Sequence, residues 1–247
     1  QCWISSTNTS QSGATSATVR NAQARNKTSK IMDKKDIADV RKDYTLGSLR
    51  SGSVVPDPIE QFELWLAEVR ATDQAEPTAM NLATCCAQGE ISSRMVLLKG
   101  VSSEGFSFFT NYESKKANQI KDNAFAALCF WWSSLERQIR IQGEVVKLSA
   151  KECDEYFNSR PRASRIGAIA SPQSRVLSSD SELQDKFDAI TEQYQGEEDI
   201  PRPAHWGGYR VIPSLIEFWQ GRPSRLHDRI CYQKKSDGSW SLDRLSP

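Results

Sequence analysis

The sequence predicts a mainly β (α+β) protein, an antiparallel β-barrel with a helical layer packed over it. Strand-like runs rich in apolar residues follow one another closely through residues 80–148 and return in residues 206–245. Residues 149–200, between the two groups, carry helix signals instead. Closely spaced strands favour antiparallel pairing over repeated βαβ units, so a barrel with a helical insertion is expected.

The first helix is expected to begin at Asp57-Pro58, because aspartate caps helix N-termini and proline suits the first turn. Phe62, Leu64, Trp65 and Val69 then give that helix an apolar stripe. A short helix is expected at residues 114–121. The expected strands of the first group are residues 80–86, 92–98, 106–111, 125–132 and 138–148.

Three helices are expected in the insertion, at residues 149–158, 160–170 and 179–194. Ser149 and Glu152 have capping-box spacing at the start of the first, and Ser178 or Ser179 would cap the third.

The domain itself is expected to span residues 41–247, with the insertion at about 149–200. The strands of the second group are expected at residues 206–212, 215–220, 226–234 and 240–245, the last two joined by an Asp237-Gly238 turn.

Composition excludes several classes of function. The net charge of +1 over 247 residues gives no reason to expect a nucleic acid or an acidic membrane as partner. No apolar run approaches membrane-spanning length. The six cysteines form no CxxC pair, and two histidines cannot make a His-rich metal site, so no metal is expected. A soluble, reduced, intracellular protein is the expectation.

The N-terminal segment, residues 1–40, is expected to be a leader outside the domain. Residues 1–32 are rich in Ser, Thr, Ala and Asn and hold four basic residues but no acidic one. This composition is typical of an organelle transit peptide, and equally of an ordinary disordered leader. The protein would be cytoplasmic, or mitochondrial or plastidic if the leader is a transit peptide.

The most informative stretch lies near the C-terminus, where Arg225, His227 and Arg229 alternate within an expected strand. Alternation would direct the three side chains to one face. Two guanidiniums beside an imidazole repel each other unless something anionic lies across them. A binding site for an electron-rich or phosphorylated ligand is therefore expected there.

Two further stretches favour anion binding. Lys99 follows an expected strand, where its ammonium could reach a phosphate; an ordinary basic strand end is the alternative. Ser114, Lys115 and Lys116 open an expected helix, whose free backbone N–H groups suit a phosphate. A solvated charged turn is the alternative there.

Tyr156, Arg160 and Ser164 recur at four-residue spacing and would share a helix face if the helix continued through Pro161. A kink at the proline is expected instead. A phenol, a guanidinium and a hydroxyl converging from a helix end make a phosphate cradle. The alternative is the polar outer face of a surface helix.

Weaker candidates complete the set. Gln173 and Ser174 offer an amide and a hydroxyl in a loop, and Gln138 is a polar residue within an apolar strand, where a buried amide needs a partner.

Taken together, these stretches resemble the pyridoxine (pyridoxamine) 5′-phosphate oxidase family, from about residue 41 to residue 247. The motifs that carry the resemblance follow in order: RMVLLKG, FFTNYESKK, RQIRIQG, YFNSRPRASRIGA, SPQS, WGGYRV and EFWQGRPSRLHDR. Each motif alone is weak, but the ordered set is specific. The resemblance implies an FMN-binding split β-barrel that works as a homodimer, with FMN at the subunit interface.

The resemblance also implies roles for individual residues, several of them acting from the partner chain. Arg225 and His227 would be catalytic and meet the pyridine ring. The substrate phosphate would be held by Lys99, Tyr156, Arg160 and Ser164. The implied FMN contacts are Arg94, Met95, Val96, Leu97, Phe109, Thr110, Lys115, Lys116, Gln138, Gln173, Ser174, Trp219 and Arg229.

The implied reaction is FMN-dependent oxidation of pyridoxine 5′-phosphate and pyridoxamine 5′-phosphate to pyridoxal 5′-phosphate, with O2 as acceptor and H2O2 as product. Two alternatives stay open. One is a non-enzymatic carrier of flavin or B6 vitamers, which would not need Arg225 and His227 over the ring. The other is a different split-barrel flavin reductase, in which the phosphate cradle would be left unpaired.

Overall fold

The structure is a computed structural model that describes residues 38–247, within which one compact unit spans Asp43–Pro247. The expected leader, with its basic residues and the transit-peptide interpretation, thus falls almost wholly outside the described residues. In the described part, no helix combines the length and apolarity needed to cross a membrane.

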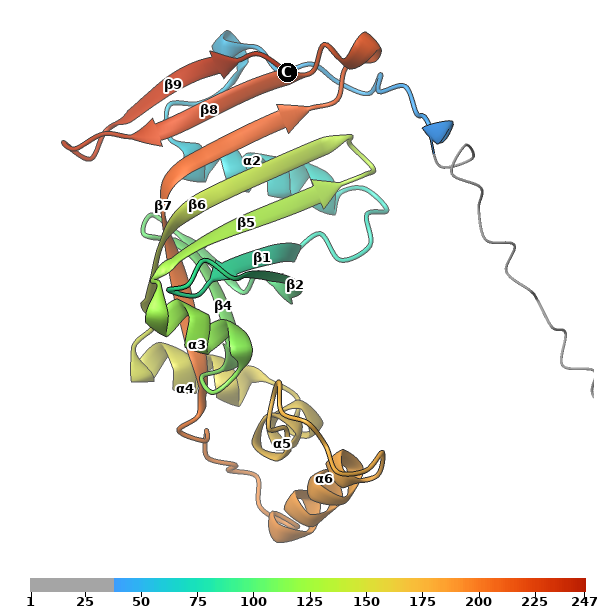
Figure 1. Ribbon diagram of the computed structural model, residues 1–247, viewed down its shortest axis with the longest axis vertical. Helices are drawn as coiled ribbons and strands as arrows, with labels where there is room; N and C mark the ends of the chain where they lie inside the picture. The colour runs from blue at the N-terminus through green and yellow to red at the C-terminus, as the bar shows by residue number, and fades with distance from the viewer. Residues whose placement is uncertain (1–37) are drawn as a thin grey trace, which may run out of the picture. The chain divides into compact units, whose positions relative to one another are not determined.

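The compact unit is built on a curled antiparallel sheet of nine strands (Figure 1). The path β2-β1-β5-β6-β7-β4-β3 forms most of it, and β8 and β9 extend it from β7. The mainly β prediction is confirmed. The strands are β1 Ala79–Cys85, β2 Ile91–Leu97, β3 Gly100–Ser102, β4 Gly105–Asn111, β5 Phe125–Trp132, β6 Arg137–Lys147, β7 Trp206–Gln220, β8 Asp228–Lys234 and β9 Trp240–Leu245.

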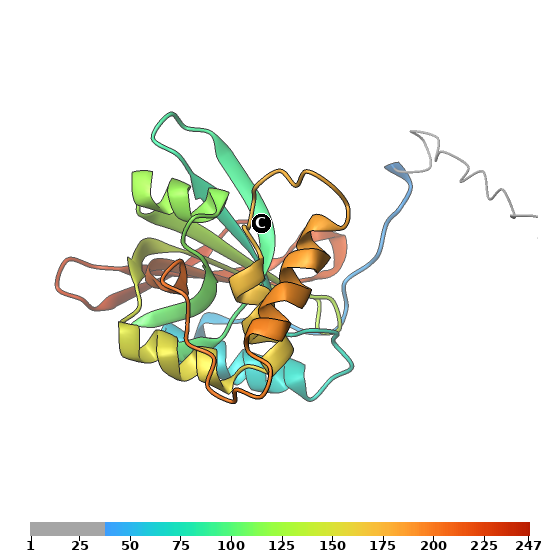
Figure 2. The same ribbon diagram turned by 90° about the horizontal axis from the view of Figure 1, so that it is seen from below.

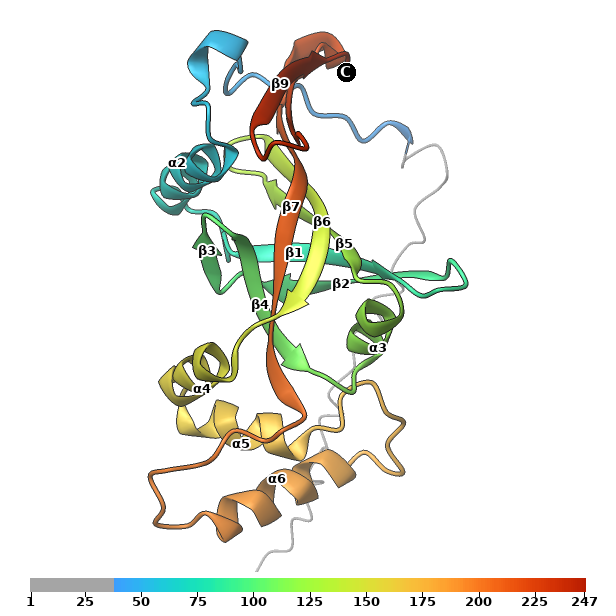
Figure 3. The ribbon, with the colours of Figure 1, turned by 90° about the vertical axis from the view of Figure 1, so that its left-hand side faces the viewer.

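Strand β7 organises the sheet. It pairs with β6 over residues 209–220, with β4 over residues 206–211, and with β8 over residues 215–220. Figure 3 shows it running from the helical layer to the β8–β9 hairpin. One neighbour of β7 is β6, and its other neighbour is β4 in the first half and β8 in the second. The sheet therefore has two lobes, one that contains β4 and one that contains β8.

The two strands expected at 206–212 and 215–220 are one continuous strand, so that prediction was wrong. Neither expected strand included Pro213, which in the structure does not end the strand and pairs with Gly143. The β6–β7 register shifts at Gln142/Gly143 instead, and this irregularity accommodates the proline inside the sheet.

Helices lie at both ends of the sheet. The helical layer of α4, α5 and α6 lies in front of the sheet in Figure 2, and the Ser149–Glu152 capping box is present as expected. Helix α6 begins later than expected, at Glu182, and Ser181 makes no side-chain cap bond. The helices are η1 Ser51–Ser53, α2 Pro58–Arg70, α3 Lys115–Asp122, α4 Ala150–Ser159, α5 Arg162–Ala170, α6 Glu182–Gln193 and η2 Pro223–Arg225.

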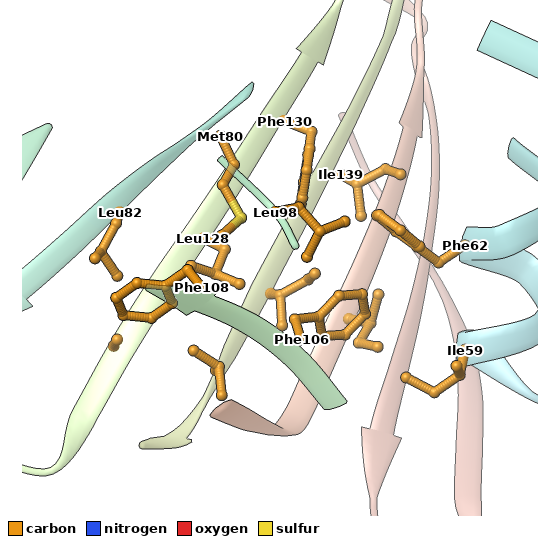
Figure 4. Packing of buried hydrophobic residues seen from close by; sticks show 14 of the residues in the cluster. Ile59, Phe62, Met80, Leu82, Leu98, Phe106, Phe108, Leu128, Phe130 and Ile139 are labelled. Carbon is orange, nitrogen blue, oxygen red and sulfur yellow. The ribbon is translucent and has the colours of Figure 1, made fainter. Parts of the chain in front are cut away.

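Helix α2 closes the core of the curled sheet. Asp57 caps it by accepting from the Ile59 N–H, as predicted. Phe62 is fully buried and meets the rings of Phe106 and Phe130 with centroids 4.9 and 5.2 Å apart (Figure 4). A second, smaller apolar cluster holds the helical layer to the start of β7.

Replacing Gly143 by alanine is expected to lower the free energy of unfolding by about 2 kcal/mol or more. A Cβ there would lie 2.0 Å from the Ile212 carbonyl oxygen, so the β6–β7 irregularity would have to open. Denaturant unfolding at one fixed protein concentration measures the change. Gly52→Ala is the matched control, because the methyl group that it adds would have no other atom within 4 Å. Equal stabilities for the two variants would contradict this account of the strand.

Candidate functional site

A cavity of about 530 Å³ opens where the helical layer meets the sheet. Its walls come from β2, β4, α3, the α4–α5 junction, one loop and the start of β7. Most of the expected phosphate and FMN contacts gather here, from segments more than 100 residues apart in the sequence. The lining residues are Arg94, Met95, Val96, Leu97, Lys99, Phe109, Thr110, Lys116, Tyr156, Arg160, Pro161, Ser164, Gln173 and Trp206.

Positive charge without a neutralising acid is the main property of this cavity. Among residues 38–247, four of those that line it are cationic and none is acidic. Arg94 donates only to neutral oxygens, those of Leu82, Thr84 and Ser92. Like charges confined in a partly buried space repel, so the cavity is suited to an anion.

Lys116 reaches the cavity from the first turn of α3, which begins as the sequence predicts. Ser114 caps the helix by accepting from the Ala117 N–H. The Lys116 ammonium donates to Gln173 Oε1 at 2.6 Å and Thr110 Oγ1 at 3.1 Å. Burial, aided by the charge of Arg94, lowers the pKa of Lys116 to about 8. A bound anion would remove that penalty.

Tyr156, Arg160 and Ser164 all line the cavity although no single helix carries them. Helix α4 ends at Ser159, Arg160 is extended at φ −79° and ψ 146°, and α5 begins at Arg162. The expected kink at Pro161 is confirmed. The break turns the three side chains toward one space, and Arg160 Nη1 is buried there with no hydrogen-bond partner in the part of the chain that the structure describes.

Aromatic rings form one wall beside this cradle. Phe109, Tyr156 and Trp206 are nearly parallel, with centroids 3.9 to 6.1 Å apart. The Arg160 guanidinium lies 4.8 Å from the centre of the Trp206 ring. Trp206 was not among the predicted site residues; only its position at the head of the WGGYRV motif signalled it.

The other expected site residues gather at the far end of β7. Gln138 pairs with Trp219 across β6–β7, and Trp219 with Arg229 across β7–β8. The His227 ring lies 4.6 Å from that of Trp219. Trp219 lies thirteen residue steps along β7 from Trp206, a contour length of about 43 Å. One chain therefore holds its two groups of site residues well apart.

The expected alternation of Arg225, His227 and Arg229 on one strand face was wrong. Pro223–Arg225 form the turn η2, in which Ser224 and Arg225 have φ of 56° and 60°, and β8 begins only at Asp228. Left-handed backbone at two successive residues cannot be extended strand. Arg225 is consequently exposed at the tip of a turn beside the half-buried His227.

Arg229 is paired with a carboxylate of the chain, which it shares with a second arginine. Glu217, almost fully buried, accepts from Arg229 Nε at 2.7 Å and from Arg140 Nη1 at 3.0 Å. This bond raises the pKa of Arg229. The anion inferred from the sequence to lie across this face is thus partly supplied by the chain itself.

The surroundings of His227 favour the neutral form of its imidazole. Burial and the charge of Arg225 lower its pKa, with a smaller opposing effect from Asp228. Its Nδ1 accepts the Arg222 backbone N–H at 3.1 Å. The neutral ring therefore carries its proton on Nε2, which is left as a donor.

Tyr44 is a residue of this second group that sequence reasoning missed. Its ring lies edge-on to Trp219 at 5.7 Å and near His227 at 5.8 Å. Glu136 Oε2 anchors the segment by accepting the N–H groups of Thr45 and Leu46. No apolar periodicity marks residues 43–49, so nothing in the pattern indicated this packing.

Two expected contacts lie outside the cavity. Lys115 is exposed and its ammonium lies 2.8 Å from Glu90 Oε1. Ser174, at φ 71°, follows Gln173 in the loop but does not line the cavity. Of the two lysines at the start of α3, the buried Lys116 alone is at the site.

Comparison with known proteins gives consistent matches. Residues 67–194 match the family model described as Pyridoxamine 5'-phosphate oxidase. Residues 206–247 match a second family model, described as Pyridoxine 5'-phosphate oxidase C-terminal dimerisation region. A pyridoxine/pyridoxamine 5'-phosphate oxidase from Salinibacter ruber is 50% identical over 85% of this chain and 99% of its own length. A pyridoxine/pyridoxamine 5'-phosphate oxidase from a Nostoc species is 52% identical over 85% of this chain and 98% of its own length.

Solved structures agree on the fold. PhzG from Burkholderia lata, in complex with tetrahydrophenazine-1-carboxylic acid, is 28% identical with a TM-score of 0.77, covering 82% of this chain and 99% of its own. An FMN-binding protein from Nostoc punctiforme, related to pyridoxamine 5'-phosphate oxidase, is 17% identical with a TM-score of 0.63. The match covers 79% of this chain and 99% of that protein's chain. The split-barrel prediction is confirmed by this likeness.

Sulfate binding to the ligand-free protein is expected to weaken as pH rises through about 8. Sulfate keeps its charge in this range, whereas the Lys116 ammonium loses its proton with a pKa of about 8. Calorimetric titration between pH 6.5 and 9.5 measures the change. In Lys116→Arg the affinity should persist to the highest pH, because arginine stays charged.

The control for this titration is Lys115→Met, which removes a neighbouring but ion-paired charge. It should leave the pH profile unchanged. A profile that is flat in the wild type, or that Lys115→Met alters as much as Lys116→Arg does, would contradict the assignment of Lys116.

Proposed function

The chain belongs to the pyridoxine/pyridoxamine 5'-phosphate oxidase family, and we propose that it oxidises pyridoxine 5′-phosphate and pyridoxamine 5′-phosphate to pyridoxal 5′-phosphate, with FMN as cofactor, O2 as acceptor and H2O2 as product. The observation that carries this proposal is the acid-free cationic cavity. Its arginine Arg160 has a buried Nη1 with no hydrogen-bond partner among the described residues. Such a donor is costly to leave unpaired, and a phosphate oxygen would satisfy it.

The cations of the cavity divide into two sets, so the cavity can accept two anionic groups. Arg94 and Lys116 lie beside the N-terminus of α3, where free N–H groups favour a phosphate. Lys99 and Arg160 lie beside Tyr156 and Ser164. We assign the first set to the FMN phosphate and the second to the substrate phosphate.

FMN would be held by both groups of site residues. The chemistry that FMN supplies when bound is two-electron acceptance, while the protein supplies position and charge. From the cavity, the contacts would be Arg94, Met95, Val96, Leu97, Phe109, Thr110, Lys116 and Gln173. From the far end of β7 in a second chain, they would be Gln138, Trp219 and Arg229. Lys115 and Ser174 could take part only through backbone groups or a rearranged side chain.

Two copies of the chain are needed to complete this site. A B6 vitamer carries its phosphate on the same small ring that Arg225 and His227 would meet, yet these residues lie far from Arg160 along β7. Trp219, Arg225, His227 and Arg229 all fall within residues 206–247, the segment that matches a dimerisation region. A homodimer in which each chain contributes one end of β7 would bring the two groups together.

Within such a site the side chains have separable tasks. The phosphate cradle would use binding energy far from the reacting carbon to fix the ring. Arg225, exposed at the tip of its turn, would orient the ring and stabilise charge during oxidation. Neutral His227, with its proton on Nε2, would donate to the oxygen on the pyridine ring. The hydrogen-bonding role for His227 is therefore favoured over that of a base.

The likeness to PhzG supports a second candidate, oxidation of a tricyclic carboxylate such as the ligand of that structure. A carboxylate needs fewer donors than a phosphate dianion. Lys99, Tyr156, Arg160 and Ser164 would then be incompletely paired. The higher identity to the pyridoxine/pyridoxamine 5'-phosphate oxidases, 50% against 28%, also favours the first candidate.

The visible spectrum of the purified protein tests the proposal. It should show bound flavin, whose absorbance bleaches on anaerobic addition of pyridoxamine 5′-phosphate and recovers when air is admitted, with H2O2 released. A carrier would bind the vitamer without bleaching or peroxide. Bleaching by tetrahydrophenazine-1-carboxylic acid but not by phosphorylated vitamers would support the second candidate instead.

A further inference from the structure

Arg160 is held by an aromatic face. Its guanidinium carbon lies 4.8 Å from the centre of the Trp206 ring and 6.0 Å from that of Phe157. Trp206 is only 6% exposed and belongs to the small apolar cluster with Phe157, Ile166 and Ile200. The ring is thus fixed by packing on one side while the cation lies against it.

This arrangement differs from that of Arg202 and Arg210, which also lie beside the helical layer. Arg202 donates to Asp154 at 2.6 Å and to the Trp206 carbonyl at 2.7 Å. Arg210 pairs with both Glu104 and Glu152. Arg160 lines a cavity without an acid, and burial lowers its pKa, which reflects an unsatisfied charge.

The difference has a physical consequence. A carboxylate would fix the guanidinium by occupying its in-plane N–H donors and cancelling its charge. An aromatic face attracts the cation perpendicular to the guanidinium plane, so it leaves those donors available. Of the two, only the aromatic face can orient an arginine and still leave its full charge and its donors for an incoming dianion.

From this geometry we propose that Trp206 is a positioning residue for substrate binding, which fixes Arg160 in the orientation that grips the phosphate. The inference rests on the proposed function, since it assigns Arg160 to a phosphorylated substrate. Trp206 acts through Arg160 and not on the reacting carbon. Its loss therefore weakens binding and leaves the chemical step intact.

The test is a comparison of KM with kcat in FMN-loaded enzyme. Trp206→Leu should raise KM for pyridoxine 5′-phosphate roughly tenfold, with kcat within about twofold of wild type. The dissociation constant for pyridoxal 5′-phosphate, measured by equilibrium dialysis without turnover, should rise by the same factor. Trp206→Phe keeps an aromatic face and should stay within about threefold of wild type. Should the leucine variant fail to fold, Trp206→Met replaces it as the non-aromatic variant.

The control is Phe187→Leu, which removes a ring packed against the same apolar cluster but outside the cavity lining. It should leave KM unchanged. If it raises KM as Trp206→Leu does, or if Trp206→Phe is as impaired as the leucine variant, the effect is one of packing and the inference is wrong.

A double-mutant cycle separates this inference from the function on which it rests. Arg160→Ala alone should raise KM, and adding Trp206→Leu should then change nothing more. An equal further rise in the double variant would overturn the role of Trp206 while the phosphate cradle stands. An Arg160→Ala enzyme with wild-type KM would instead overturn the assignment of the substrate phosphate.

Discussion

Strand β7 is the constraint on which the rest of this structure depends. It pairs with β4, β6 and β8, so it joins the two lobes of the sheet. Its first residue, Trp206, lines the cationic cavity, and its residue Trp219 lies against His227. The length of this paired strand keeps the two groups of proposed site residues apart in one chain, and the proposed active site, which needs both groups, would be shared by two chains.

The charges of the cavity follow from the same division. Arg94, Lys99, Lys116 and Arg160 have no acid among their neighbours in the lining. The lowered pKa of Lys116 and the unpaired Arg160 Nη1 are the cost of keeping that cavity ready for anions. Ligands that bind only the folded protein offset this cost, so bound cofactor and substrate should also stabilise the fold. At the other end of β7, Glu217 partly neutralises Arg229 and Arg140. A ligand at that end therefore has less positive charge to balance.

Local signals predicted much of this structure and failed at two kinds of position. Caps and turn chemistry identified helices α2 and α4 and the β8–β9 hairpin, because these depend on neighbours in sequence. The division of β7 into two expected strands failed because a register shift against β6 accommodates Pro213 within one strand. The alternation of Arg225 and His227 failed because two successive left-handed residues precede β8. Trp206 and Tyr44 belong to the site through contacts with residues far away in the sequence. Hydrophobic periodicity does not encode such contacts.

The shared site is tested most directly by a mixed dimer of two defective chains. Arg160→Ala removes a cavity residue and Arg225→Ala a residue of the far end, and each variant alone should turn over pyridoxine 5′-phosphate poorly below saturation. Co-expression with different affinity tags and tandem purification yields the mixed dimer. If each site takes one end of β7 from each chain, one of its two sites is intact, and about half of wild-type activity should return. Activity that stays at the level of the single variants would show that each chain completes its own site, and would contradict this account.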